Sequence, residues 1–84
     1  MPPNKIVTVD TPGIYELRVQ GDVDQSWSER MLGVNIRVLN SPGEPPVTVL
    51  TGRFVDQAAL AGVLSTLYDF GFPLLEVRRL EAQP

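Results

Sequence analysis

The chain contains neither cysteine nor histidine. Without cysteine there can be no disulfides, no thiolate nucleophile and no Cys-ligated zinc or iron–sulfur site. Without histidine the chain lacks the commonest general base and metal ligand, together with every Ser-His or Cys-His pair. The composition therefore favours a protein that carries no catalytic site, metal or cofactor.

Long apolar runs and an excess of positive charge are missing as well. No segment approaches the ~18 consecutive apolar residues of a membrane span. The formal net charge is −3, which weakens attraction to nucleic-acid phosphates and to anionic membrane surfaces. The N-terminal residues 1–5 lack the basic and apolar regions of a signal peptide. We therefore expect a cytoplasmic location, with no nucleic-acid and no membrane partner.

What the chain does contain is enough for one small globular domain. It has 84 residues, of which 43% are hydrophobic. A domain of this size buries only roughly 60–65% of its unfolded surface and is stable by about 4–12 kcal/mol, so association would add useful stability. We predict an N-terminal extension over 1–13, in which residues 6–9 are a candidate edge strand, a single α+β domain over 14–80, and a tail over 81–84.

The segment that follows Val55 has the strongest helical pattern. Asp56 is a suitable N-cap, and Val55 with Leu60 has the spacing of a hydrophobic staple. Gly71 fits a left-handed C′ position, with Phe72 reaching back in a Schellman closure. One apolar stripe comprises Leu60, Val63, Leu64 and Leu67. We expect it to pack on one sheet face made of Leu17, Val19, Ile36, Val38, Leu50 and Val77.

Strand-like segments surround this helix. Alternating or β-branched residues predict strands over 14–20, 34–39, 47–54 and 74–80. Gly52 indicates a bulge or a close backbone approach. Between the first two strands, Ser26 and Glu29 fit a capping box, and Gly33 fits the C′ position that ends a helix. These signals predict a short helix.

This order of elements predicts an α+β fold with a four-stranded, mainly antiparallel sheet. One long helix and one short helical turn cover one face. The βαββαβ sequence favours an abbreviated ferredoxin-like arrangement. The connector over 21–33 is barely long enough for a parallel crossover, so a βββαβ meander is the alternative.

The connector also carries the candidates for chemistry. Oxygen side chains alternate from Asp22 to Ser28, as in a calcium loop, but Trp27 and Gly33 stand where the EF-hand pattern needs Gly and Glu. We interpret this stretch as a capped turn and Trp27 as a packing anchor over the sheet edge. Tyr68 and Asp69 suggest a cleft beside the 21–25 turn. No nucleophile–base pair is present there, so no reaction is assigned.

The sheet face opposite the long helix is the candidate interaction face. Its charges are mixed in sign, which favours cross-strand pairs worth ~0.2–1 kcal/mol each over an anion site. Arg78 and Arg79 should point to opposite faces of their strand. The face is predicted to comprise Ile14, Glu16, Arg18, Arg37, Leu39, Val49, Leu74, Glu76 and Arg78.

Several short motifs carry a family resemblance. They are YELRVxG from Tyr15, WS at Trp27, LTG from Leu50 and DQAALxGxLxxLxDxGxPLL from Asp56. Together they resemble a group of short uncharacterised bacterial proteins, over about residues 14–80. The resemblance implies a small stand-alone cytoplasmic protein. It supplies no activity and no functional residues.

Our functional hypothesis is a small non-catalytic module for protein interaction or assembly. A regulatory ligand-binding domain is the alternative, and an enzyme of unknown reaction is the third reading. We also predict a two-fold homodimer, joined through the candidate interaction face or through the 6–9 strand. In the competing monomer, residues 6–9 fold back beside the strand over 15–19.

Overall fold

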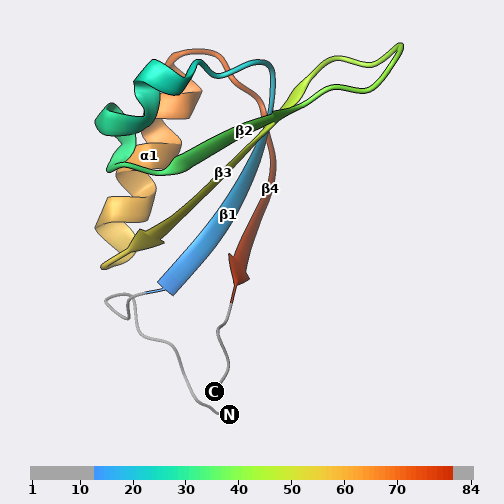
Figure 1. Ribbon diagram of the computed structural model, residues 1–84. Coiled ribbons are helices and arrows are strands. Elements are labelled where there is room, and N and C mark those ends of the chain that lie inside the picture. The colour runs from blue at the N-terminus through green and yellow to red at the C-terminus, as the bar shows by residue number, and fades with distance from the viewer. Residues whose placement is uncertain (1–12, 81–84) are drawn as a thin grey trace.

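The computed structural model describes residues 13–80, which form one sheet with helices on one side (Figure 1). In chain order the elements are β1 (Gly13–Gln20), the 3₁₀ helix η1 (Gln25–Met31), β2 (Asn35–Leu39), β3 (Val47–Phe54), α1 (Gln57–Asp69) and β4 (Leu74–Leu80). The candidate strand over 6–9 lies outside the described residues.

The sheet has the strand order β2-β3-β1-β4, and all neighbouring strands are antiparallel. β1 and β2 are therefore parallel to each other with β3 between them, and β3 and β4 are parallel with β1 between them. Each parallel pair, with the helix that connects its strands, is a βαβ unit split by one inserted strand. Two such interlocked units make the ferredoxin-like arrangement. The α+β prediction is confirmed. The meander alternative is wrong, because β1 pairs with β3 and β4 and not with β2.

This pairing also bears on the competing monomer. β3 and β4 occupy both sides of β1, with Leu17 aligned to Leu50 on one side and to Val77 on the other. No place in the sheet is left beside residues 15–19. Both backbone edges of β1 are therefore already paired within residues 13–80.

The first crossover is short because its helix is a 3₁₀ helix. A 3₁₀ helix advances about 2.0 Å per residue, against 1.5 Å in an α-helix, so fewer residues cross β3. Its N-cap is Asp24, whose carboxylate accepts from the Ser26 N–H at 3.4 Å, and not Ser26 as the capping box predicts. The Thr48 hydroxyl accepts from the Val23 N–H at 3.0 Å and donates to the Gly21 carbonyl, which ties this segment to β3 just before the helix begins.

Both ends of α1 follow the sequence signals closely. The Asp56 carboxylate accepts from the Ala59 N–H at 2.8 Å. At the other end the Phe72 N–H donates to the Leu67 carbonyl and the Gly71 N–H to the Tyr68 carbonyl, both at 3.0 Å, which is the predicted Schellman closure. The staple is weaker than predicted, because Val55 stays 62% exposed.

The core lies between the sheet and the two helices, and α1 packs on β3 and η1. The buried cluster comprises Leu17, Val19, Val23, Met31, Val34, Ile36, Leu50, Phe54, Leu60, Val63 and Leu67. Leu64 and Val38 are half-buried, and Val77 is 41% exposed. The predicted helix–sheet contact therefore holds at the β3 side and fails at β4, which α1 does not cover.

Gly52 shows the predicted close approach. A Cβ at Gly52 would lie 2.8 Å from Cγ1 of Val34, so only glycine lets Val34 lie across the strand there. β3 keeps an unbroken register with both neighbours, and the bulge that Gly52 suggested is absent from this strand.

Candidate functional site

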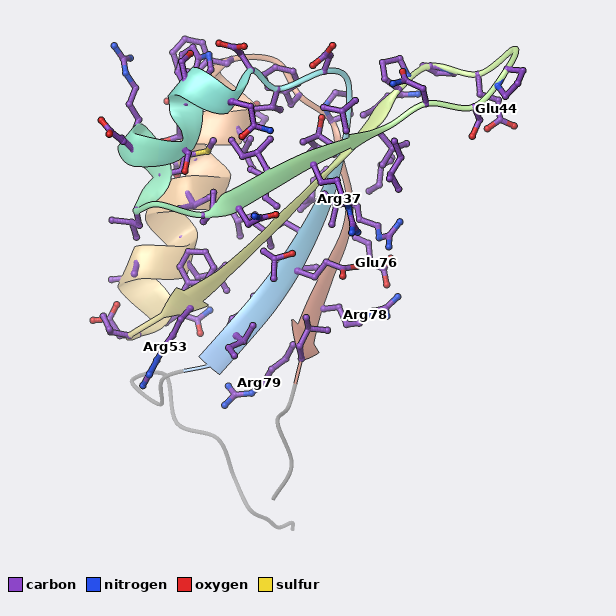
Figure 2. The ribbon with its side chains drawn as sticks, in the orientation of Figure 1. Arg37, Glu44, Arg53, Glu76, Arg78 and Arg79 are labelled. Carbon is purple, nitrogen blue, oxygen red and sulfur yellow. The ribbon has the colours of Figure 1, made fainter. Side chains whose placement is uncertain are left out.

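The sheet face opposite α1 is built by the alternate residues of all strands. Since Leu17 and Val19 are buried under the helices, Glu16 and Arg18 point to the other side. The register then aligns Arg37, Val49, Arg18 and Glu76 in one row, and Asn35, Thr51, Glu16 and Arg78 in the next. Figure 2 shows Arg37, Glu76 and Arg78 on this side. The predicted members on it are Ile14, Glu16, Arg18, Arg37, Leu39, Val49, Glu76 and Arg78.

Leu74 is the one predicted member that lies elsewhere. A register shift between Arg18 and Val19 pairs Glu76 with Arg18 but Leu74 with Val19. One residue of β4, Leu75, is left over at this bulge. Leu74 therefore moves to the helix side, where it lines a groove with α1.

Glu16, Arg18, Glu76 and Arg78 form a cluster that we call the charge ladder. The Arg18 Nε lies 2.9 Å from the Glu16 carboxylate and 3.9 Å from that of Glu76, and an Arg78 Nη lies 3.0 Å from Glu76. The hydrogen bond to Glu76 raises the pKa of the Arg78 guanidinium above its usual value. The four charges pair with one another and their signs balance, so the charge ladder has no excess of positive charge to hold an anion.

The apolar members of this face expose little surface. Val49 is 1% exposed, with the long side chains of its register partners Arg18 and Arg37 beside it. Ile14 and Leu39 are 39% and 38% exposed and lie at opposite ends of the sheet, Ile14 at the start of the inner strand β1 and Leu39 at the end of the edge strand β2. This face offers a partner mainly charge, and less apolar contact than the sequence suggested.

A more apolar surface lies on the helix side, between α1 and β4. It is a groove of about 480 Å³, lined by Leu64, Ser65, Leu67, Tyr68, Phe72, Pro73 and Leu74. Tyr68 is 81% exposed and Leu74 49% exposed. Val77 continues this apolar surface along β4, since its register partner Leu17 lies on the same side. The groove is not visible in the sequence, because its lining comes from α1 and from the start of β4, which only the fold brings together.

The two outer edges of the sheet differ. At β2, the Gln25 side-chain amide donates to the Ile36 carbonyl at 2.6 Å, and the Ser28 hydroxyl donates to the Val34 carbonyl at 2.6 Å. η1 thus covers that edge with its own polar side chains. At β4, no side chain among residues 13–80 hydrogen-bonds to the strand backbone. β4 is an outer strand, and most of its residues are exposed.

The connector between β1 and β2 is held by a cap and by ring contacts. The Ser26 hydroxyl and N–H both bind the Asp24 carboxylate and lower the pKa of Asp24. Within residues 13–80, no three acidic side chains gather closely enough to hold a metal ion. Trp27 packs against the core with its ring edge-on to Phe70, at a centroid distance of 4.3 Å, and Arg30 lies 5.0 Å from the Trp27 ring centre.

The sequence predicts a cleft between Tyr68, Asp69 and the 21–25 turn, and the structure places the Phe72 ring against Gly21 at that turn. Phe72 lies so close to Gly21 that a Cβ there would be 2.8 Å from the ring. Tyr68 instead borders the groove with Pro73 and Leu74.

A comparison with known protein families gives a match over most of the chain. The family model described as domain of unknown function (DUF8691) matches residues 14–78, and the chain belongs to this family. No curated protein and no solved structure matches the chain. No helix among the described residues is both long and apolar enough to cross a membrane.

Proposed function

We propose that this member of a family of unknown function is a non-catalytic protein-interaction module that binds through β4. In this proposal an extended segment of a partner pairs with the open edge of β4 as an added strand. Its alternate side chains contact the groove and Val77 on the helix side. Such strand addition takes affinity from main-chain hydrogen bonds and specificity from side-chain pockets.

The observation that carries the proposal is the uncovered edge strand next to an apolar groove. α1 packs on β3 and η1, which leaves Leu74, Leu75 and Val77 of β4 between 41% and 53% exposed. Single exposed apolar residues are ordinary, but here they lie together along an edge that no other strand of residues 13–80 pairs with. Proteins generally block such edges unless a partner covers them.

The non-catalytic part of the proposal rests on composition and on the titratable groups. The sequence has no cysteine or histidine. The pKa shifts of Asp24 and Arg78 arise mainly from hydrogen bonds with Ser26 and Glu76, each two residues away in the sequence. Catalytic acids and bases usually have pKa values shifted by burial in a cleft. We keep a bacterial, cytoplasmic setting as part of the proposal, on the strength of the sequence resemblance.

A selection from displayed random linear peptides tests the proposal, followed by NMR mapping of the binders. We expect selected peptides to shift the amides of β4 and of the groove lining. Val77→Lys places a charge on the helix side of β4 and should weaken the selected peptides by about tenfold or more, equivalent to about 1.4 kcal/mol.

Leu39→Lys is the matched control, since Leu39 is 38% exposed against 41% for Val77 and lies on the other edge strand. Leu39→Lys should leave peptide affinity within about twofold of the parent, because residues away from the centre of an interface contribute little binding energy. Peptides that shift the opposite sheet face, or that bind Val77→Lys as tightly as the parent, would overturn the proposal.

The groove also supports the second candidate, a small regulatory ligand-binding domain. Its volume of about 480 Å³ falls within the range of small-molecule sites, and its lining is mostly apolar. A thermal-shift screen with amino acids, nucleotides and metal ions discriminates the two candidates. A ligand at ~100 times its dissociation constant adds about 2.7 kcal/mol, so a large specific shift would favour ligand binding.

A further inference from the structure

We infer that the partner strand on β4 is β4 of a second copy, paired antiparallel about a two-fold axis at Val77. The inference rests on the proposed function, because it needs the edge of β4 to accept a strand. It names the partner and the register. Its support is the order of charges along β4 and across the charge ladder.

The sequence of β4 is self-complementary about Val77. In an antiparallel pair centred there, Glu76 lies opposite the partner's Arg78, and Arg78 lies opposite the partner's Glu76. Opposite charges facing each other across strands are stabilising. Both side chains can take part, since Glu76 is 42% and Arg78 54% exposed, and both lie on the face away from α1 (Figure 2).

The neighbouring strand extends this pattern. Within one copy, Glu16 aligns with Arg78 and Arg18 aligns with Glu76. Across the proposed junction one row therefore runs Glu16, Arg78, the partner's Glu76 and the partner's Arg18. The row related to it by the two-fold axis has the same order and begins at the partner's Glu16. Charges alternate along both rows, so the charge ladders of the two copies join without placing like charges face to face.

Other registers lose this match. A two-fold centred on Glu76 or on Arg78 would put that residue against its own copy, and like charges directly opposite are destabilising. The Val77 register also puts Val77 against the partner's Val77 on the helix side. The apolar surfaces beside the two grooves then become continuous.

The other edge of the sheet does not offer an equivalent junction. β2 is shorter, and its central residue is Arg37, which a symmetric pair would place against its own copy. The Gln25 amide already occupies the Ile36 carbonyl there. Charge order and backbone access therefore both select β4.

Sedimentation equilibrium of the full chain with charge-reversal variants tests the inference. The parent should form a dimer, whereas Glu76→Arg and Arg78→Glu should each be monomers of 9.3 kDa at the same loading. An equimolar mixture of the two variants should form a heterodimer, because every facing pair is again of opposite sign. Arg37→Glu makes a matched charge reversal on the other edge and should leave the parent dimer intact.

Cross-linking provides a second readout that does not depend on the charge variants. The chain has no native cysteine, so Val77→Cys introduces a unique thiol. Directly opposite residues in an antiparallel pair have Cα atoms about 4.5–5.5 Å apart, within the range of a disulfide. Oxidation should link Val77→Cys into dimers at least about tenfold faster than Leu39→Cys, the control with similar exposure on β2.

The outcomes separate this inference from the proposed function. A parent that remains at 9.3 kDa up to high micromolar loading overturns the inference, while peptide binding that is lost in Val77→Lys would still support strand addition on β4. A parent dimer that both single charge variants retain, or equal cross-linking of Val77→Cys and Leu39→Cys, also overturns it.

Discussion

The two edge strands of this sheet, β2 and β4, belong to the same fold and have opposite surroundings. η1 packs beside β2, buries Ile36 to 4% exposure and places the Gln25 amide on its carbonyl. Neither η1 nor α1 covers β4, and Val77 at its centre is 41% exposed. Figure 1 shows both helices gathered on the side of β2 and β3, with β4 as the outer strand on the opposite side.

The difference shows how shortening one helix changes a ferredoxin-like domain. With a 3₁₀ turn in place of the first helix, α1 is the one full helix of residues 13–80 that covers the sheet. α1 then packs beside η1 over β3, where the buried cluster is continuous, and leaves β4 uncovered. An edge strand with unpaired backbone groups is a natural pairing site. The missing helix length thereby produces the candidate interaction surface.

The largest expected contrast is between truncations of one apolar residue in each of the two edge strands. Ile36→Ala should lower the free energy of unfolding by about 2–5 kcal/mol, because it leaves a cavity in the buried cluster. Val77→Ala should cost less than about 1 kcal/mol in the monomer, since much of the side chain is already in water. Urea unfolding of both variants at a concentration below association measures this. Similar losses at the two sites would show that β4 is covered as well as β2.

A glycine at the junction of the two regions should give the next largest effect. Gly21 has φ +120°, and an added Cβ would meet the Phe72 ring at 2.8 Å. Gly21→Ala should therefore destabilise by about 2–3 kcal/mol, from backbone strain together with displacement of Phe72.

Gly33→Ala is the matched control for Gly21→Ala. Gly33 has φ +74° and no atom within 4 Å of the added Cβ, so only the backbone cost of about 1 kcal/mol is expected. Thermal melts of the two variants compare them. An equal loss of stability in the two variants would mean that Phe72 moves aside without a cost in free energy. The segment before β4 would then be loosely packed.

The polar cover of β2 can be tested by removing it. Gln25→Ala deletes the hydrogen bond to the Ile36 carbonyl and should cost about 0.5–1.5 kcal/mol. Gln57→Ala, an exposed change in the first turn of α1, should stay within about 0.5 kcal/mol of the parent. Urea unfolding checks both. If Gln25→Ala also brings new association through β2, the amide protects that edge in addition to stabilising it.

The smallest effect concerns pH and the cap of η1. Hydrogen bonds from the Ser26 hydroxyl and N–H lower the pKa of Asp24 in the folded protein. A lowered folded-state pKa means that this contribution is present above the unfolded pKa of about 3.9 and is lost as pH falls through the folded value. The Ser26 amide shift should therefore titrate below pH of about 4 in the parent and stay flat in Asp24→Asn. A flat parent curve would remove Asp24 as the pH-sensitive cap.

Local signals in the sequence were sufficient for α1 and for the identity of all four strands. The Asp56 cap and the Gly71-Phe72 closure involve atoms within a few residues of one another, so their spacing is visible in the chain. The true cap of η1 was not visible. Asp24 caps the helix because the Thr48 hydroxyl holds Val23 and Gly21 to β3, a contact between segments more than 20 residues apart.

The candidate site was predictable only where it depends on short-range geometry. Alternation along each strand placed Glu16, Arg18, Glu76 and Arg78 on one face, because successive side chains of a strand point to opposite faces of the sheet. Alternation failed at Leu74, where the bulge against Val19 interrupts the period. The groove could not be predicted, since its walls come from α1 and from the start of β4.

The sequence by itself determined where each helix and strand lies, how α1 begins and ends, and which charges share a sheet face. These properties depend on short-range geometry and on side-chain period. Only the tertiary structure decided that β1 lies between β3 and β4, that α1 packs beside η1, and that these two helices leave β4 uncovered next to a groove. Those features depend on how the whole apolar surface is buried at once, and two helices of unequal length cannot cover both halves of the sheet equally.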